Sequence, residues 1–75
     1  MSPKLPVVSG PQLIKALSKL GYYIREQQGS HIHLRHPLRP PLTVPNHREI
    51  SRGTLRAIIR QAGLSLDEFV NALKK

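Results

Sequence analysis

The residues best suited to chemistry in this chain are two histidines and an arginine at alternating positions, His31, His33 and Arg35. In a β-strand, successive side chains point to opposite faces, so these three would share one face while Ile32 and Leu34 share the other. Imidazole exchanges protons near neutral pH, and guanidinium binds phosphate in a fork geometry. The pattern therefore predicts a strand with a proton-transferring, anion-binding face and an apolar face that joins a core.

His31 is the first candidate for catalysis, because Gly29 and Ser30 precede it directly. Glycine permits the close approach of another backbone, and a serine hydroxyl is suited to orienting a phosphate or a ring. RNA cleavage without a metal needs a base for the 2′-hydroxyl proton and positive charge beside the phosphoryl oxygens. An imidazole pKa of about 6.5 meets the first need. From spacing alone, an exposed strand histidine without a role is the open alternative.

The other three histidines carry weaker signals. His33 would share the face of His31, but two histidines without a third ligand are a weak indication of a metal, so we expect a phosphate contact or plain exposure. His36 precedes Pro37, where a structural role is expected. His47 lies in a connection that the sequence does not place; it is a weak candidate for joining the site or contacting a partner, and a loop histidine without a role is the alternative. No metal and no cofactor are expected.

The chain is small and strongly basic: its 75 residues include 12 Lys and Arg against 4 Asp and Glu, a formal net charge of +8. Self-repulsion at this charge opposes compaction, which favours a polyanionic partner such as RNA over an inert basic surface. The absence of cysteine excludes disulfides and a thiol nucleophile. The chain also has no glycine-rich phosphate loop, and its few carboxylates are too scattered for a two-metal nuclease.

Residues 1–8 predict an irregular tail, because Pro3 and Pro6 cannot donate backbone hydrogen bonds, and Lys4 is available to a partner. This segment has no apolar run long enough for a signal peptide, and no segment reaches the ~20 apolar residues that span a bilayer. We therefore expect a cytoplasmic protein without a membrane contact, folded as one RNA-binding or ribonuclease domain over residues 1–75.

Three helices are predicted from apolar side chains at helical spacing. Each begins after a serine suited to capping it, and the first two end at a glycine. The expected caps are Ser9, Ser51 and Ser65, and the terminating glycines are Gly21 and Gly63. The core-facing positions are Leu13, Ile14, Leu17, Leu20, Leu55, Ile58, Ile59, Ala62, Leu66, Phe69, Val70 and Leu73.

An alternating segment, residues 22–27, predicts the first of three strands, with Tyr23, Arg25 and Gln27 on the face that carries His31. An aromatic ring there would stack on a base, and arginines would hold backbone phosphates. A solvated sheet face without a ligand is the alternative. The RNA-binding residues expected on this face are Tyr23, Arg25, His33 and Arg35.

Gln28 and Gly29 predict a tight turn into the second strand, residues 29–35. A third short strand is expected at residues 42–44, after a proline-rich break. The order α-β-β-β-α-α predicts an α+β fold with two layers, in which a three-stranded antiparallel sheet packs on helices. The arrangement is similar to the double-stranded-RNA-binding domain.

Arg52, Arg56 and Arg60 lie four residues apart, so they share one face of the predicted second helix. No acidic residue lies four positions away to pair with them, which favours a negative ligand or partner. A row that only keeps the helix soluble is the alternative. Thr54, near the start of this helix, would join an anion site formed by free N–H groups.

Five segments occur in an order that is specific for a chain of this length. They are Leu13–Leu17 with Leu20-Gly21-Tyr22, Gly29-Ser30-His31, Arg35-His36-Pro37, Thr43–His47 and Gly53–Ser65. With these segments the chain resembles the HicA-type toxins of bacterial toxin–antitoxin systems, also called YcfA-like mRNA interferases. The resemblance extends over nearly all of residues 9–73.

The resemblance implies a metal-independent endoribonuclease that cleaves mRNA and is neutralised by a HicB-type antitoxin. It makes His31, in the Gly-Ser-His motif, the catalytic residue, with Gly29 and Ser30 as supporting residues. Many members place a second histidine directly after the first, whereas this chain has Ile32 there, so His33 receives no proton-transfer role. The rival interpretations are a non-catalytic RNA-binding module and a protein-interaction domain.

Overall fold

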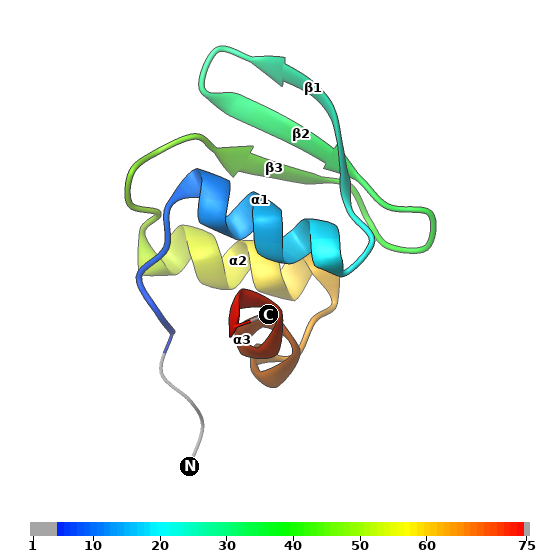
Figure 1. The fold of residues 1–75 in the computed structure, drawn as a ribbon. Coiled ribbons are helices and arrows are strands. Elements are labelled where there is room, and N and C mark those ends of the chain that lie inside the picture. Colours follow the sequence, from blue (N-terminus) through cyan, green and yellow to red (C-terminus); the bar gives the residue numbers. More distant parts are fainter. Residues whose placement is uncertain (1–4, 75) are drawn as a thin grey trace.

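The fold of the chain is that predicted from the order of its elements. The computed structural model describes residues 5–74, so residues 1–4 of the expected tail 1–8, with Pro3 and Lys4, lie outside the described residues. Residues 5–8 are irregular as predicted, but Val8 is buried and its carbonyl accepts from the Ile50 N–H at 2.8 Å, so this part is packed against the domain. The elements are α1 (Gly10–Lys19), β1 (Tyr23–Gln28), β2 (His31–Arg35), β3 (Leu42–Pro45), α2 (Arg52–Ala62) and α3 (Leu66–Lys74) (Figure 1). The predicted α+β class and the order α-β-β-β-α-α are confirmed.

All three predicted helix caps form. The Ser9 hydroxyl accepts from the Gln12 N–H at 3.2 Å, and the Gln12 side chain accepts from the Ser9 N–H at 2.9 Å. The same reciprocal pair joins Ser65 and Glu68: the Ser65 N–H donates to the Glu68 carboxylate at 3.0 Å, and the Glu68 N–H donates to the Ser65 hydroxyl at 3.1 Å. Hydrogen bonding from Ser65, first of all from its backbone N–H, lowers the pKa of the Glu68 carboxyl. Ser51 caps α2. Because each cap satisfies N–H groups that a helix leaves open, the starts of these helices can be located from sequence.

The three strands form one antiparallel sheet in the order β1-β2-β3. Gln28 pairs with His31, so the turn consists of Gly29 and Ser30, and β2 begins at His31. The turn predicted at Gln28-Gly29 was therefore placed one residue too early. Gly29 has a φ of +59°, the left-handed conformation that a two-residue hairpin turn with glycine first requires.

A β-bulge interrupts β1 at Arg25. Ile24 pairs with Leu34, but the next pair is Glu26 with His33, and Arg25 has no partner. Beyond the bulge the alternation is displaced by one residue. Glu26 therefore joins the face of His33, and the prediction that Gln27 lies on that face was wrong.

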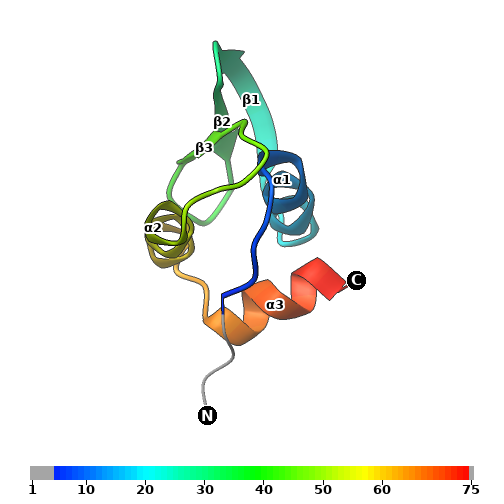
Figure 2. The same cartoon turned by 90° about the vertical axis from the view of Figure 1, so that its left-hand side faces the viewer.

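The core lies between one face of the sheet and the helices. The sheet contributes Ile32, Leu34, Leu42 and Val44, all buried. Figures 1 and 2 show α1 and α2 beneath this face and α3 on their far side, away from the sheet. α1 and α2 pack against β3, whereas every residue of β1 is exposed, so β1 extends beyond the helices as a free edge. No helix in residues 5–74 has the length and hydropathy to cross a bilayer.

The proline-rich segment between β2 and β3 is irregular but firmly anchored. The Arg39 guanidinium donates to the Ala62 carbonyl at 2.8 Å, where α2 ends, and lies 4.0 Å from the Glu68 carboxylate. Side chains thus replace the regular hydrogen bonds that prolines cannot make. The Tyr22 hydroxyl donates to the Pro40 carbonyl at 2.9 Å. Burial raises the pKa of this phenol, and the charge of Arg39 partly opposes the shift.

Candidate nucleic-acid interface on the sheet

The face of the sheet opposite the helices is open to solvent and polar; we call it the outer face. Alternation along β2 places His31, His33 and Arg35 on it, as predicted, because Ile32 and Leu34 turn into the core. Cross-strand pairing adds residues from both neighbouring strands. The outer face comprises Tyr23, Glu26, Gln28, His31, His33, Arg35, Thr43 and Pro45, and the bulged Arg25 lines a hollow on it.

His31 is exposed and stands at the first position of β2, directly after the hairpin turn. The Asn46 N–H donates to the Ser30 carbonyl at 2.7 Å, which ties this turn to the segment that follows β3. No hydrogen bond joins the His31 ring to another residue in the described part of the chain. The ring is therefore accessible for proton exchange with a bound ligand.

Gly29 supports this position in a different way from the one expected. A side chain there would have no neighbouring atom within 4 Å, so Gly29 does not serve the close approach of another backbone. Its contribution is the positive φ of the turn, which sets His31 at the start of the strand.

His33 is held by a neighbour. Its Nδ1 lies 3.1 Å from the Thr43 hydroxyl, and its side chain is half-buried between Glu26 on one side and Thr43 on the other. The contact with Thr43 fixes the orientation of the ring on the outer face, where it can contact a bound ligand.

A hollow of about 300 Å³ brings three of the predicted RNA-binding residues together. Arg25, His33 and Arg35 all line it, as does Glu26. Arg35 lies four residues from His31, about 13 Å along an extended strand. Tyr23 pairs with Arg35 and is 56% exposed, so its ring is free on the same face. The hollow is thus a cationic site at one end of the outer face, with the candidate catalytic ring at the other.

Sequence reasoning missed Glu26, the one carboxylate of the outer face. The displaced register brings it opposite His33 and beside the two arginines of the hollow. The alternation of side chains along β1 does not place Glu26 on this face, because the bulge becomes visible only in the pairing of β1 with β2. A negative charge here weakens the attraction of this face for phosphate.

His47 lies beyond the end of β3. Its carbonyl accepts from the Gly10 N–H at 2.8 Å, and its side chain is exposed. This contact is close: a Cβ on Gly10 would lie 2.6 Å from the Pro45 carbonyl oxygen. The start of α1 therefore fixes the segment after β3, but the contact positions the backbone of His47 and not its ring.

The arginine row of α2 is not part of the outer face. The Gln61 amide donates to the Pro41 carbonyl, so Gln61 marks the side of α2 that faces the start of β3. At 100° per residue, Arg52 lies about 180° from Gln61 around the helix. The row runs along the exposed flank away from β3, and Thr54 donates its N–H to the Ser51 cap.

Among residues 5–74, no three His, Cys, Asp or Glu side chains gather as a set that could hold a metal ion. The chemistry that the outer face offers is an exposed imidazole, two guanidinium groups and an exposed aromatic ring. These are the groups for proton transfer, phosphate binding and base stacking, respectively.

Comparison with protein families gives a match over most of the chain. The family described as the HicA toxin of bacterial toxin-antitoxin matches residues 10–64, a range that includes the whole outer face and α2. A search of curated proteins gave no match. A toxin of such a pair has a cognate antitoxin as its partner. The match confirms the resemblance seen in the sequence: this chain belongs to the HicA toxin family of bacterial toxin–antitoxin systems.

Proposed function

We propose that this toxin is a metal-independent endoribonuclease that cleaves mRNA with His31, and that a HicB-type antitoxin neutralises it in the cytoplasm. The observation that supports this most is the exposed imidazole of His31 on the same sheet face as the cationic hollow of Arg25 and Arg35. The whole of residues 1–75 would act as one ribonuclease domain.

The outer face suggests a path for the RNA. Arg25 and Arg35 hold backbone phosphates at the hollow, and a base stacks on Tyr23. The strand then runs along β2, so that a neighbouring linkage reaches His31. Gly29 and Ser30 support the catalytic ring, since their turn sets its position and the Ser30 carbonyl anchors that turn to Asn46.

The reaction uses the 2′-hydroxyl of the RNA as its nucleophile. His31 either removes the 2′-proton while the oxygen attacks the adjacent phosphorus, or donates a proton to the departing 5′-oxygen, and solvent water exchanges the other proton. The phosphorus–5′-oxygen bond breaks, and the products are a 2′,3′-cyclic phosphate and a free 5′-hydroxyl. The guanidinium groups of Arg25 and Arg35 lie at the other end of the outer face, so they hold flanking phosphates and supply a positive field rather than contacting the reacting phosphoryl oxygens.

The test compares two exposed histidines. Purified wild-type protein, His31→Ala and the control His47→Ala are incubated with end-labelled mRNA, with and without EDTA. We expect His31→Ala to cleave about 10²- to 10⁴-fold more slowly, at an unchanged melting temperature. We expect His47→Ala to keep the wild-type rate, and EDTA to have no effect.

Three outcomes would contradict the proposal. Cleavage by His31→Ala at the wild-type rate would remove the catalytic assignment, and loss of activity in EDTA would indicate a metal. Retention of RNA by the wild type without new ends would favour the non-catalytic RNA-binding module instead. Retention of no RNA even at low salt would favour a protein-interaction domain.

A further inference from the structure

The arginine row of α2, which consists of Arg52, Arg56 and Arg60, takes no part in the outer face or in the proposed reaction. All three side chains are exposed. They recur every fourth residue, so each lies about 6 Å further along the helix axis than the one before it. The row therefore places three guanidinium groups along one flank of α2 over about 12 Å.

The fold does not account for this row. α2 carries no acidic residue, and no ion pair within residues 5–74 involves these arginines, since the salt bridge found there joins Arg39 to Glu68. Like charges four residues apart repel each other along a helix. Arg52 also stands at the first position of α2, where the positive end of the helix dipole opposes a cation. An anion bound along this flank would relieve both repulsions.

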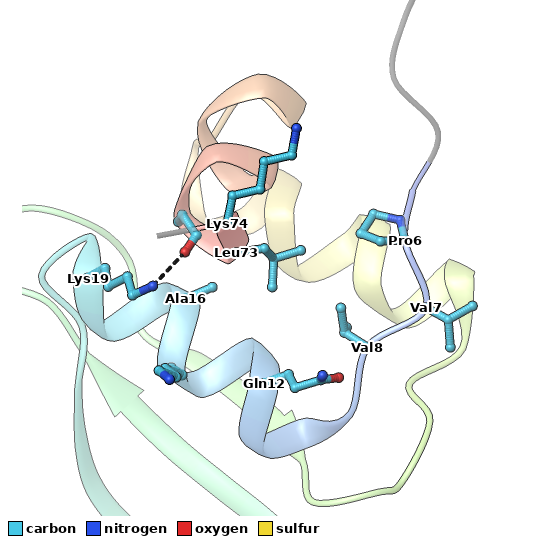
Figure 3. A pocket seen from close by; sticks show the side chains of 10 residues that line it. Pro6, Val7, Val8, Gln12, Ala16, Lys19, Leu73 and Lys74 are labelled. Carbon is cyan, nitrogen blue, oxygen red and sulfur yellow. Dashed lines mark hydrogen bonds between the residues drawn. The ribbon is translucent and has the colours of Figure 1, made fainter.

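A second group of cations differs from the row. Lys15, Lys19 and Lys74 line a hollow of about 440 Å³ between the segment before α1, α1 itself and the last turn of α3, which we call the back groove (Figure 3). The Lys19 ammonium group is engaged with the fold, because it donates to the Ala72 carbonyl at 3.1 Å (dashed in Figure 3). Lysine is also a flexible point charge and not a phosphate-binding fork. These lysines therefore serve as the comparison for the arginine row.

The surroundings of the row select a nucleic-acid backbone as its occupant. A protein partner needs an apolar centre to its interface, and a membrane needs apolar side chains to insert. The exposed large apolar side chains within residues 5–74 all lie outside α2; they are Val7, Tyr23, Ile24 and Leu38. Guanidinium groups without apolar neighbours fit phosphates, which they bind through paired hydrogen bonds.

The row also offers no ring on which a base could stack, since α2 contains no aromatic residue. Contacts from the row would therefore reach the phosphates of an RNA and not its bases. Such contacts carry no sequence information, but they add affinity that decreases as the salt concentration rises. They suit a part of the RNA that is held and not cut.

We propose that the arginine row binds backbone phosphates of the same RNA, at a distance from the linkage that His31 cleaves. The proposal rests on the proposed function, in which RNA is the substrate of the outer face. Because α2 lies beneath the sheet (Figures 1 and 2) and the row faces away from β3, the two surfaces do not overlap. An RNA that extends beyond the outer face reaches both, and the second contact then becomes intramolecular and raises the affinity. The toxin therefore favours long RNA over short RNA.

The experiment compares RNA strands of two lengths. A strand of about 6 nucleotides, roughly 20 Å long when stacked, covers the outer face and little more, whereas about 30 nucleotides, roughly 100 Å, exceed the 37 Å length of the molecule. All proteins in this comparison carry His31→Ala so that the RNA is not cleaved. Affinity is measured by filter binding over a range of salt concentrations, and melting temperatures show that each variant is folded.

Two variants of equal charge are compared with the His31→Ala parent. Arg52→Gln/Arg56→Gln removes two charges of the row, and Lys15→Gln/Lys74→Gln removes two exposed charges beside the back groove. We expect the row variant to bind the long RNA about tenfold more weakly and the short RNA within about twofold of the parent. For the long RNA, its slope of log affinity against log salt concentration should be shallower by about 1.4, because two phosphate contacts are lost. The lysine variant should bind both RNAs within about twofold of the parent.

Three outcomes would overturn the proposal. Equal losses of affinity in the two variants would reduce the effect to general electrostatics. Equal losses for short and long RNA in the row variant would mean that the row acts on the outer face and not on a separate part of the RNA. Unchanged affinity of the row variant for long RNA, together with weaker binding of the purified antitoxin, would assign the row to a protein partner.

These outcomes are separate from the fate of the proposed function. Cleavage of the short RNA by the wild type, with His31 intact, tests the reaction without the row. If the wild type binds the short RNA but does not cleave it, the catalytic assignment fails and the row is still tested by the affinity for long RNA. If the wild type cleaves the short RNA while the row variant keeps the parental affinity for long RNA, only the inference about the row fails.

Discussion

His31 and His36 lie at opposite ends of the same short strand region, and their surroundings differ completely. The His31 ring is exposed on the outer face. The His36 ring is engaged on both nitrogens: the Leu38 N–H donates to its Nδ1 at 2.9 Å, and its Nε2 lies 2.9 Å from the Leu20 carbonyl. Because Nδ1 accepts, the proton of this ring resides on Nε2, which donates to Leu20.

The difference shows how one residue type serves two purposes in a small protein. The His36 ring also contacts Tyr22 edge to face, with centroids 4.8 Å apart, so it joins the end of α1 to the loop after β2. Its role is structural, as predicted. The His31 ring contributes little to the fold and is free for chemistry. Substitutions should therefore separate stability from activity, and the following predictions test that separation.

The largest effect on stability is expected at Gly21, which packs against the His36 ring. Gly21 has a φ of +102°, and a Cβ there would lie 2.6 Å from His36 Nε2. Gly21→Ala should lower the free energy of unfolding by about 3 kcal/mol, since backbone strain adds to the steric clash. Urea denaturation measures the change. The double variant Gly21→Ala/His36→Ala should lose less than the sum of the single losses, and strict additivity would show that the clash is unimportant.

His36→Ala should cost about 2–3 kcal/mol, because it removes two hydrogen bonds and leaves their backbone partners unpaired. His31→Ala should change the free energy of unfolding by less than about 0.5 kcal/mol, as expected for an exposed side chain. The same denaturation curves, recorded beside the cleavage assay, compare the two. Equal destabilisation by both substitutions would mean that His31 also has a structural role.

Tyr22→Phe should cost about 1 kcal/mol at pH 7, because the Pro40 carbonyl loses its donor. Since burial raises the folded-state pKa of Tyr22, its neutral form stabilises the fold fully below the unfolded pKa of about 10. That contribution is lost as pH rises through the folded pKa. Between pH 7 and a pH above 10, the free energy of unfolding should therefore decrease less for Tyr22→Phe than for the wild type. Parallel declines would exclude Tyr22 as a source of alkaline instability.

The smallest effect is expected at Glu26, within the outer face. Glu26→Gln removes the carboxylate beside Arg25, Arg35 and His33, so the hollow should bind RNA about two- to fivefold more tightly. RNA affinity is measured by filter binding, and both proteins carry His31→Ala so that the RNA is not cleaved during the measurement. Glu49→Gln is the matched control, because it removes the same charge from an exposed position outside the outer face, and it should leave RNA binding by the hollow nearly unchanged. Weaker binding by Glu26→Gln would mean that Glu26 orients the arginines.

The parts of the fold that could be predicted from sequence are those with local causes. Serine caps, glycine ends and apolar spacing depend on residues within a few positions of one another, so the three helices were located correctly. The face shared by His31, His33 and Arg35 was also correct, because alternation within β2 is uninterrupted.

The remaining features depend on contacts between distant segments. The bulge at Arg25 is set by pairing with β2, so sequence reasoning placed Gln27 where Glu26 lies. The anchoring of the proline-rich loop by Arg39 joins residues more than twenty positions apart. The back groove combines the segment before α1 with the end of α3, and no local pattern indicates that these two segments meet.

The bulge at Arg25 has a consequence for the free edge of the sheet. β1 presents an unpaired side with an aliphatic Ile24 that is 55% exposed, and a flat edge of that kind invites strands of neighbouring molecules to add to it. A kink in its middle, with the charged Arg25 at the distortion and Glu26 next to it, breaks the straight row of donors and acceptors that such stacking requires. The same irregularity that rearranges the polar face thus makes this edge a poorer template for strand addition by other copies.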